Sequence, residues 1–527
     1  FFVSAGIQSI VRHYKKHNGD IKLLDEKIAI HINDTHPTLA IPELMRILLD
    51  EEGLSWENAW RITQNTISYT NHTILAEALE KWPVDMFKSL LPRIYMIIEE
   101  INKRYCEELW NKYVGQWDKI SRMAIIGDGY VRMANLAIVG SHSVNGVAKL
   151  HTEILKKKEM SDFYYLYPSK FNNKTNGITH RRWLIRSNPD LTKLLLDTIG
   201  DSFIKHPTDL ENFKNYLNDR SVLKRLGEIK KGNKDKLAKE IYKSKGIVID
   251  TNSIFDVQIK RIHAYKRQTL NCLRIMDLYN KLIDNPNLDI IPRTFIFAGK
   301  AAPGYYLAKN TIELICRVAE TINNDPRVNQ KIKVVMLDNY QVSLAEKIIP
   351  ATDLSEQIST TTKEASGTSN MKFMMNGAIT IATLDGANIE IKDEVGEDNI
   401  VIFGLNAEEV LNYHKNGGYS SWDVCNKDPR LQRVTNDLIN GKYIRDKDRF
   451  RTIYENLLTY NDEFFVLKDF DSYLKAQEKV NELYIDKERW QRMCGVNIAH
   501  SGIFSSDRTI KEYATGIWGS TVIYKNL

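Results

Sequence analysis

The sequence predicts an α/β protein whose carboxyl-terminal part is a doubly wound parallel sheet. From residue 247 onward, short runs rich in β-branched and aromatic residues alternate with longer amphipathic segments. Such alternation is typical of βαβ units, in which helices connect parallel strands by right-handed crossovers. Predicted strands are 254–259, 294–298, 332–337, 378–384 and 400–403, with helices at 268–282, 305–322 and 343–349; residues from about 450 are again helical.

Residues 1–175 are predicted to be mostly helical, with one clear strand at 28–32. That strand runs into Asn33–Asp34–Thr35–His36–Pro37 and then into a helix with Leu39, Ile41, Leu44 and Ile47 facing inward. Polar residues at a strand-to-helix junction are typical of ligand sites in open α/β sheets. Asp34 and His36 are therefore candidate ligand-binding residues, although for His36 taken alone helix capping or core packing is the favoured interpretation.

A second polar segment of this region, Thr70–Asn71–His72–Thr73, also precedes a predicted helix, which makes His72 a candidate. The segment 133–155 has apolar residues at helical spacing, and Gly140 and Gly146 within it are expected to permit close helix packing.

A domain boundary is expected in the polar segment 172–179, which gives domains of 1–176 and 177–527. Beyond it, residues 201–245 are helical and heavily charged, and their lysines are expected to form a solvated face. A phosphate site on these lysines is the weaker alternative.

Bulk properties are those of an ordinary globular protein. The chain has 527 residues, 43% hydrophobic and 27% charged, so two or three domains are expected. The net charge of +6 is small and not concentrated, which argues against nucleic acid or a membrane as main partner. Five scattered cysteines form no CxxC pair and indicate neither disulfides nor a metal site; we expect no metal and a reducing, cytoplasmic location.

The chain begins without methionine and reads as a piece of a longer protein.

The most informative stretch is Glu364–Phe373, EASGTSNMKF, followed by an apolar run. Lys372 lies among Met371, Phe373 and Met374, and an ammonium in an apolar site is costly unless it is paired or neutralised. A neutral amine in such a pocket is a nucleophile that can form a Schiff base with an aldehyde cofactor. The alternative is a lysine whose stem covers the core while its head reaches water.

Small and hydroxylated residues precede Lys372, from Ser366 to Ser369, before a helix expected near Asn370. Helix N-termini bind anions, and glycine lets a ligand approach the backbone. Together with the lysine, this segment suggests a phosphorylated aldehyde.

A basic segment, Lys260–Arg267, follows directly on a predicted strand and contains four Lys and Arg residues in eight positions. Arginine offers a fork matched to phosphate oxygens and lysine a compact charge, so this is a candidate phosphate site. A basic helix start on the surface is the alternative. The loop Gly299–Gly304, GKAAPG, matches neither GxGxxG nor a Walker sequence, so it does not support nucleotide binding.

These motifs resemble those of the alpha-glucan phosphorylases, the family of glycogen, starch and maltodextrin phosphorylases. The resemblance covers the whole chain and is carried by EASGTSNMKF together with INDTHP, TNHT, KTNGIT, VQIKRIHAYKRQ, AGKAAPGY and SGIFSSDRTIKEYA. It implies two doubly wound, Rossmann-like domains of the GT-B type facing a cleft, with the first domain incomplete here. It also implies a glycosyltransferase that uses pyridoxal 5'-phosphate and inorganic phosphate to cleave terminal α-1,4-glucosidic bonds with retention, releasing glucose 1-phosphate.

In such a reaction the cofactor phosphate would relay a proton to the departing oxygen, which fits the shortage of obvious acid/base carboxylate pairs. By the same resemblance, Lys372 would carry the cofactor, and Lys372, Arg261, Lys266, Lys260 and His72 would take part in catalysis. The cofactor would be lined by Lys260, Thr368, Ser369, Tyr340, Gln341 and Trp183. Arg261 and Lys266 would hold the substrate phosphate. The glucosyl unit would lie among Glu364, Ala365, Ser366, Gly367, Asn176, Val147 and His72, with Asp34 and His36 toward the acceptor glucan.

Three departures from the family pattern are visible. Gln341 stands where better-known members place an arginine on the cofactor phosphate, Ser369 replaces a glycine, and His180 replaces a proline. The largest departure is that the family's amino-terminal portion, with a glycine-rich loop, precedes Phe1, so the piece alone is expected to have doubtful activity. The complete enzyme is expected to be a homodimer.

Two other functions remain open: a nucleotide-sugar-dependent glucosyltransferase of the same architecture, similar to glycogen synthase, and a non-catalytic glucan-binding module. Transaminase chemistry is disfavoured by the adjoining sugar and phosphate motifs.

Overall fold

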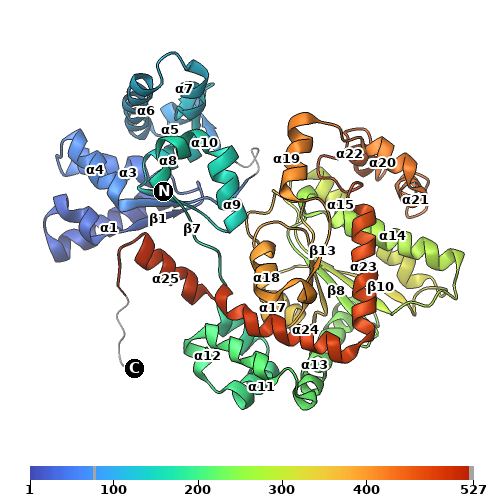
Figure 1. Ribbon diagram of the computed structural model, residues 1–527. Coiled ribbons are helices and arrows are strands. Elements are labelled where there is room, and N and C mark those ends of the chain that lie inside the picture. The colour runs from blue at the N-terminus through green and yellow to red at the C-terminus, as the bar shows by residue number, and fades with distance from the viewer. Residues whose placement is uncertain (75–78, 522–527) are drawn as a thin grey trace. The chain divides into compact units, whose positions relative to one another are not determined.

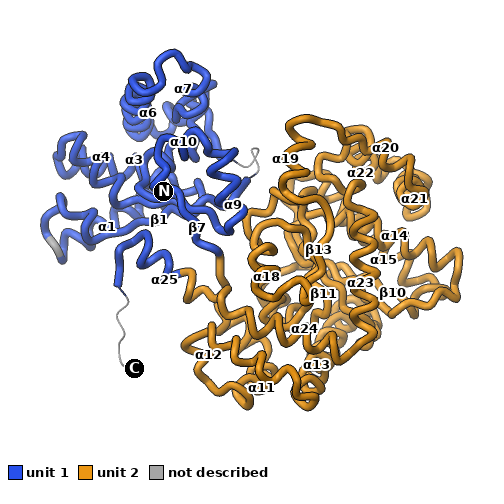
Figure 2. The backbone as a smooth tube through the Cα atoms, in the orientation of Figure 1, with its two compact units in different colours: residues 1–175, 510–527 blue, residues 176–509 orange. Residues whose placement is uncertain are grey.

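A computed structural model describes residues 1–74 and 79–521 of the chain. Its contacts divide the chain into two compact units, which Figure 2 distinguishes by colour. Unit 1 consists of residues 1–175 with 510–527, and unit 2 consists of residues 176–509. Each unit contains its own parallel sheet, as the predicted α/β class requires.

Unit 1 is built on a four-stranded parallel sheet in the order β1-β2-β6-β7 (Figure 1). The strands are Ile30–Asn33, Ile67–Thr70, Ser143–Gly146 and Phe171–Asn173. A small antiparallel sheet, β3-β5-β4, adds Lys81–Pro83, Tyr130–Arg132 and Ile126–Gly127. The region is mostly helical, as predicted, but the prediction of a single strand was wrong. The missed strands have only two to four residues, which is too short for a periodic pattern to distinguish a strand from a loop. β2 and β6 also bury polar residues, since both strands are buried at every position.

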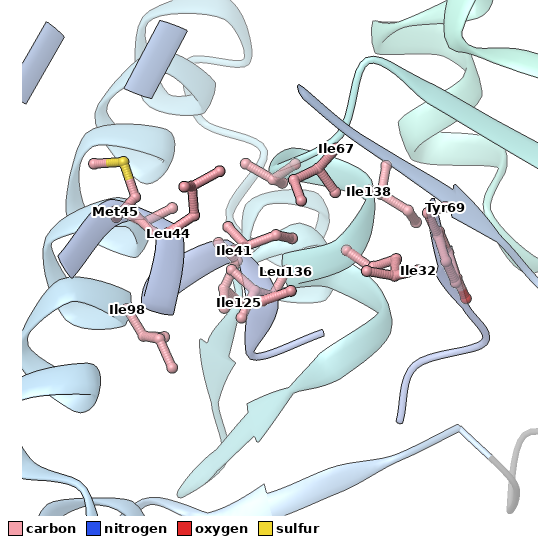
Figure 3. Close-up of a cluster of buried hydrophobic side chains, with 14 of the residues drawn as sticks. Ile32, Ile41, Leu44, Met45, Ile67, Tyr69, Ile98, Ile125, Leu136 and Ile138 are labelled. Atoms are coloured by element: carbon pink, nitrogen blue, oxygen red, sulfur yellow. The ribbon is translucent and has the colours of Figure 1, made fainter. Parts of the chain in front are cut away.

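Helices pack around this sheet and form the core of unit 1. The main helices are α1 (Phe2–Asn18), α3 (Ala40–Arg46), α4 (Trp56–Thr66), α6 (Pro92–Lys112), α8 (Met133–Val139) and α9 (Lys149–Ile154). Figure 3 shows Ile41 and Leu44 of α3 among Ile32 of β1, Ile67 of β2 and Leu136 of α8; all five are buried. The inward face predicted for the helix after His36 is confirmed at Ile41, Leu44 and Ile47, while Leu39 is half-buried.

The segment 133–155 differs from its helical prediction because β6 lies between α8 and α9. Its glycines do mark close packing. A Cβ added at Gly140 would lie 2.7 Å from the side chain of Ile41, and one at Gly146 would overlap Thr152. The helix predicted after His72 would begin near residues 75–78, which lie outside the described residues.

Unit 2 contains a six-stranded, fully parallel sheet in the order β10-β9-β8-β11-β12-β13 (Figure 1). Numbered along the chain from β8, the strand order is 3-2-1-4-5-6, that of a doubly wound dinucleotide-fold sheet. The strands are Ile254–Ile259, Arg293–Ala298, Ile332–Leu337, Leu354–Gln357, Ile379–Ala382 and Val401–Ile402 for β8 to β13. The doubly wound sheet predicted for this part of the chain is confirmed.

Helices connect these strands and follow them to the carboxyl terminus. They are α14 (Gln268–Asp284), α15 (Tyr306–Asn324), α16 (Val342–Ala351), α17 (Ser369–Met375) and α18 (Asn388–Val395). Further along lie α22 (Arg451–Leu457), α23 (Phe470–Ile485), α24 (Lys487–Ala499) and α25 (Ser506–Gly516), as predicted for a helical end.

The strand that the sequence did not reveal is β11, Leu354–Ser355–Glu356–Gln357, which is fully buried between β8 and β12. Glu356 there accepts hydrogen bonds from the Tyr473 hydroxyl at 2.9 Å and from Gln477 Nε2 at 2.7 Å. Burial, with the nearby Asp256, raises the pKa of Glu356 well above its ordinary value. A buried polar strand is tolerated because partners from α23 satisfy its side chains.

The change of direction in the strand order falls between β8 and β11. β9 and β10 lie beyond β8 on one side of this point, and β12 and β13 lie beyond β11 on the other. The loops after β8 and β11 therefore diverge, and ligands of open α/β sheets bind in the crevice at the carboxyl ends of such a strand pair. In this chain those loops are residues 260–263 and 358–368.

We predict that Gly299→Ala destabilises the loop after β8. A Cβ at Gly299, which follows β9, would overlap the main-chain carbonyl oxygen of Lys260, and a backbone atom cannot rotate away. The expected cost is about 1–3 kcal/mol of unfolding free energy, measured by urea denaturation. Gly304→Ala is the matched control in the same loop, because no atom lies within 4 Å of its added Cβ. An equal loss in both variants would contradict the close approach.

Candidate active site

The basic segment after β8 places its cations in three different environments. Lys260 and Lys266 are buried, Arg261 is exposed, and Arg267 is fully buried. Arg267 donates to the Ile358 carbonyl at 2.7 Å and to Asp469 Oδ2 at 2.6 Å. Arg267 therefore ties the loop after β8 to the end of β11, and the other three cations are available to the crevice.

Glu364, from the loop after β11, is the carboxylate that meets the buried lysines. Its Oε2 lies 2.6 Å from Lys266 Nζ and 3.8 Å from Lys260 Nζ, and it accepts the Ser359 hydroxyl at 2.9 Å. Burial raises the pKa of Glu364, but the two ammonium charges outweigh this and bring it to about 2. The carboxylate is thus held ionised between two cations.

The two lysines respond differently to this environment. Burial lowers the pKa of Lys260 to about 8 in spite of Glu364. Burial also acts to lower the pKa of Lys266, but its short contact with Glu364 is stronger, and the net shift is upward. Lys266 is therefore the firmly charged member, while Lys260 is the one whose charge depends on what else lies in the crevice.

Asp385, after β12, holds the loop that carries Glu364. Its carboxylate accepts the backbone N–H groups of Thr362 at 2.8 Å, Lys363 at 3.3 Å and Glu364 at 2.7 Å. Thr362 has φ +75°, a left-handed conformation that is strained for a β-branched residue. Burial and the neighbouring Glu364 charge raise the pKa of Asp385 to about 7. These hydrogen bonds to Asp385 are what maintain the strained turn.

Lys372 lies in α17, where its Nζ is 4.1 Å from the centroid of the Trp183 ring. Lys372 forms no ion pair in the part of the chain that the structure describes. Burial lowers its pKa. Asn376 fixes both residues by donating to the carbonyls of Trp183 at 2.7 Å and Lys372 at 3.0 Å. Lys372 is half-buried. An amine against an aromatic ring, without a carboxylate, is compatible with the nucleophilic lysine of the sequence hypothesis, which stays a prediction.

The predicted anion cradle is a tight turn into α17. Gly367 has φ +76°, and the Ser366 carbonyl accepts the N–H of Ala387 at 2.9 Å and Asn370 Nδ2 at 3.3 Å. Ala365 is buried, while Thr368 and Ser369 are half-buried. Ser369 Oγ lies 3.4 Å from Gln357 Oε1, which connects the turn to β11.

The remaining candidates of unit 2 are Tyr340, Gln341 and Asn176. Tyr340 is half-buried, and burial raises its pKa to about 12. Gln341 is exposed and precedes α16. Asn176 is half-buried, and its carbonyl accepts a hydrogen bond from Arg508 at 3.0 Å.

The candidates of unit 1 gather at the carboxyl ends of β1 and β2. Asp34 has φ +62°, and its N–H donates to the Thr70 carbonyl at 2.9 Å. His72 Nε2 is hydrogen-bonded to Asn33 Oδ1, and burial lowers the pKa of His72. His36 is exposed, 3.4 Å from Glu80, and neither caps α3, whose N-cap is Leu39, nor packs in the core. The interpretations of His36 as a helix cap or as a core residue are therefore wrong.

Val147 is buried after β6, and its N–H donates to His151 Nδ1 at 3.1 Å. Burial and the nearby His72 lower the pKa of His151 to about 3. The structure thus brings Lys260, Lys266 and Glu364 of unit 2 together, and in unit 1 it places Asp34 and His72 after the adjacent strands β1 and β2. A single site made from both groups stays a prediction.

Sequence reasoning missed Asp385, the Ser359 hydroxyl that donates to Glu364, and Asp469, the partner of Arg267. Asp385 carried a usable signal, because it is an acid directly after a predicted strand and before Gly386. Ser359 is a short polar residue in a predicted loop and gave no signal, although it lies only five residues before Glu364. Asp469 gave none because its partner Arg267 lies 202 positions away in the sequence. Within the described residues, no helix is long and apolar enough to cross a bilayer, and no group of three metal-ligating side chains gathers.

Comparison with known proteins identifies the family. Residues 1–520 match the model of the Phosphorylase family, described as carbohydrate phosphorylase. This chain is a member of the carbohydrate phosphorylase family. It is 57% identical over 519 residues to the glycogen phosphorylase of Bacillus subtilis (strain 168), covering 98% of this chain and 65% of that protein.

Animal members of the carbohydrate phosphorylase family are also similar. The muscle form of glycogen phosphorylase from Bos taurus is 47% identical, over 98% of this chain and 63% of that protein. The liver form from Homo sapiens is 48% identical, over 98% of this chain and 62% of that protein. The chain therefore spans 62–65% of the length of these phosphorylases.

We predict that Glu364→Gln destabilises this phosphorylase chain by about 3 kcal/mol at pH 7, because two buried ammonium groups lose their only shared carboxylate. The difference between the wild-type and variant free energies of unfolding should shrink as the pH falls. The folded pKa of Glu364 is about 2, whereas an unfolded glutamate has a pKa of about 4.3. The wild-type contribution is therefore complete above about pH 5 and is lost as the pH falls toward 2.

Urea denaturation of both proteins between pH 7 and pH 3 measures this effect. Glu463→Gln, at an exposed position of the same unit, is the matched control and should show no such trend. A difference between wild type and Glu364→Gln that stays constant down to pH 3 would show that the ion pair does not carry this stability.

Proposed function

We propose that the enzyme containing this chain is a glucan phosphorylase. It would use inorganic phosphate to cleave terminal α-1,4-glucosidic bonds of glycogen or maltodextrin, with retention, releasing glucose 1-phosphate. The observation that carries the proposal is Lys372, an amine against the Trp183 ring with a lowered pKa, in the same unit as the Lys260–Lys266–Glu364 cluster. Membership of the carbohydrate phosphorylase family supports it.

The residues around Lys372 fit pyridoxal 5'-phosphate as the cofactor. Lys372 is a neutralisable amine for its aldehyde, and Trp183 offers a ring surface beside that amine. Lys260, Tyr340, Gln341, Thr368 and Ser369 would line the group. When bound, this cofactor supplies a phosphate with a second pKa of about 6, able to donate and accept protons near neutrality.

The chain's own cations would bind and orient the second phosphate, the substrate. Arg261 is exposed and forms no ion pair among the described residues, so its guanidinium can take a phosphate in a bidentate fashion. Lys266, fixed by Glu364, adds a charge at a defined position. Preorganised cations stabilise the negative charge of a phosphate better than solvent does, because they need not reorganise during the reaction.

Glu364 and Asp385 are poorly suited to hydrolysis. A glycosidase needs two carboxyl groups that flank the scissile bond and face the substrate. Asp385 is buried and already accepts three backbone N–H groups, and Glu364 is bound to Lys266. This arrangement favours transfer to phosphate over transfer to water.

The other substrate contacts follow the same proposal. Glu364, with Ala365, Ser366, Gly367 and Asn176, would surround the glucosyl unit. Val147 and His72 would join them from unit 1, and Asp34 and His36 would lie toward the glucan acceptor. We further propose domains of 1–176 and 177–527 in the complete enzyme, a homodimeric state and a cytoplasmic location.

We predict that borohydride reduction of the full-length enzyme leaves a phosphopyridoxyl group on Lys372. Peptide mass spectrometry should locate this adduct, and Lys372→Ala should lack both the adduct and phosphorolysis. Lys309→Ala, at an exposed lysine of α15, is the control and should retain both. A nucleotide-sugar-dependent glucosyltransferase would show no adduct in any variant. A fully active enzyme with an unmodified Lys372 would overturn the proposal.

We predict that Arg261→Ala lowers kcat/KM for glucan phosphorolysis by about 10²–10³ while the cofactor stays bound, because Arg261 serves the substrate phosphate. Release of glucose 1-phosphate and cofactor absorbance measure the two effects separately. Arg317→Ala, an arginine of α15 paired with Glu320, is the control and should be unchanged. Loss of the cofactor from Arg261→Ala would mean that Arg261 serves the cofactor's phosphate instead. A glucan-binding module would release no sugar phosphate from any variant.

A further inference from the structure

A second basic cavity lies in unit 2, between α13 (Arg220–Lys245) and α24. Its volume is about 580 Å³, within the range of small-molecule sites. Most of its cations come from α13, where Arg220, Lys224, Lys231 and Lys234 follow helical spacing. Lys230, from α13, and Lys487, at the start of α24, complete the set of cations.

The α13 lysines do not all form the solvated face expected from the sequence. Lys230 donates to three backbone carbonyls, of Pro350 at 3.0 Å, Thr352 at 2.6 Å and Asn376 at 3.0 Å. Lys234 is buried, and its Nζ is 2.6 Å from Asp353 Oδ2. These two charges are fixed in the wall of the cavity, because their donors are already engaged.

The carboxylates of the cavity are too few for its six cations. Asp353 is bound to Lys234 at 2.6 Å, and Glu488 is 3.2 Å from Arg220. Outside the lining, Asp235 lies 2.7 Å from Lys231 and Glu228 lies 3.9 Å from Lys224. Each of these acids is therefore committed to a neighbour, and the lining keeps an excess of positive charge.

Lys487 is the cation left for a ligand. It forms no ion pair among the described residues, and its Nζ lies 3.0 Å from the centroid of the Tyr484 ring. Although Lys487 is exposed at the rim, partial burial against the cavity wall lowers its pKa to about 8; Lys234 adds to this effect and Asp353 opposes it. An anion at this position would gain a charge-assisted hydrogen bond that no protein group supplies.

The cavity also has an apolar part. Leu223 and the buried Tyr484 line it, and Gly227 leaves α13 without a side chain between Lys224 and Lys231. Tyr484 is fixed by an edge-to-face contact with Trp490, whose ring centroid is 5.0 Å away. An aromatic surface beside unpaired positive charge suits a ligand with one flat apolar part and one anionic part.

We propose that this cavity binds a small organic phosphate that carries an apolar ring. Its phosphate group contacts Lys487 and the α13 cations Lys224 and Lys231, and its ring packs on Leu223 and Tyr484. The site is separate from the Lys260–Lys266–Glu364 cluster and does not depend on the proposed phosphorolysis.

Acetylation of lysines followed by peptide mass spectrometry tests this on the full-length enzyme, with phenyl phosphate as the probe. The Arg261→Ala background suppresses binding of the probe to the substrate phosphate site. Phenyl phosphate should slow acetylation of Lys487 at least fivefold, whereas Lys479, an exposed lysine of α23 outside the cavity, should react at an unchanged rate. An unchanged rate at Lys487 would overturn the proposal.

Two further measurements test the apolar part of the site and the α13 cations separately. Inorganic phosphate at the same concentration should protect Lys487 less, because it cannot use Leu223 and Tyr484; equal protection would contradict the apolar part of the site. The Lys224→Ala/Lys231→Ala variant should lose protection of Lys487 while native circular dichroism is retained. Full protection in that folded variant would show that the α13 cations take no part.

Discussion

The salt bridge between Lys266 and Glu364 connects the two halves of the six-stranded sheet at the point where its strand order reverses. Lys266 follows β8 and Glu364 follows β11, and their charged atoms are 2.6 Å apart. The loops after β8 and β11 diverge from this switch point. They are also joined by the Thr360 N–H, which donates to the Tyr265 carbonyl at 2.8 Å, and by Arg267, which donates to the Ile358 carbonyl. The separation of these strand ends depends on the salt bridge together with these contacts, and Lys260 and Arg261 belong to the same loop.

Holding three charges in a largely desolvated crevice is costly, and the surrounding structure offsets the cost with polar contacts. Ser359 donates to Glu364, and Asp385 accepts the N–H groups around it. On the other side, Arg267 is bound to Asp469 and to the Ile358 carbonyl. Buried charges require such partners, because desolvation otherwise removes the charge or unfolds the site. Lys372 differs from these groups, since it lies against the Trp183 ring without a carboxylate and burial lowers its pKa.

Whether a strand could be predicted from the sequence depended on its length and on the polarity of its residues. The strands β8, β9 and β10 were predicted within one residue, because each has six residues and is dominated by apolar or β-branched side chains. β11 was missed although it lies in the middle of the sheet. Its Ser355, Glu356 and Gln357 look like a loop. Their burial is possible because Tyr473 and Gln477 of α23 bond Glu356, while Gln357 donates to the Ser355 hydroxyl. The short strands of unit 1 were missed for a related reason, since three or four residues carry too little periodicity.

The sequence by itself determined the family and the doubly wound class of the second unit, and it supplied the candidate site residues, because these lie in contiguous motifs. Lys372 with its apolar neighbours and the basic segment 260–267 are such motifs. Only the tertiary structure decided which charges meet: Glu364 with Lys266, Asp385 with the strained turn at Thr362, and Lys234 of α13 with the buried Asp353 rather than with solvent. Electrostatic contacts and desolvation depend on distances through space, and residues separated by about a hundred positions acquire those distances only when the chain packs.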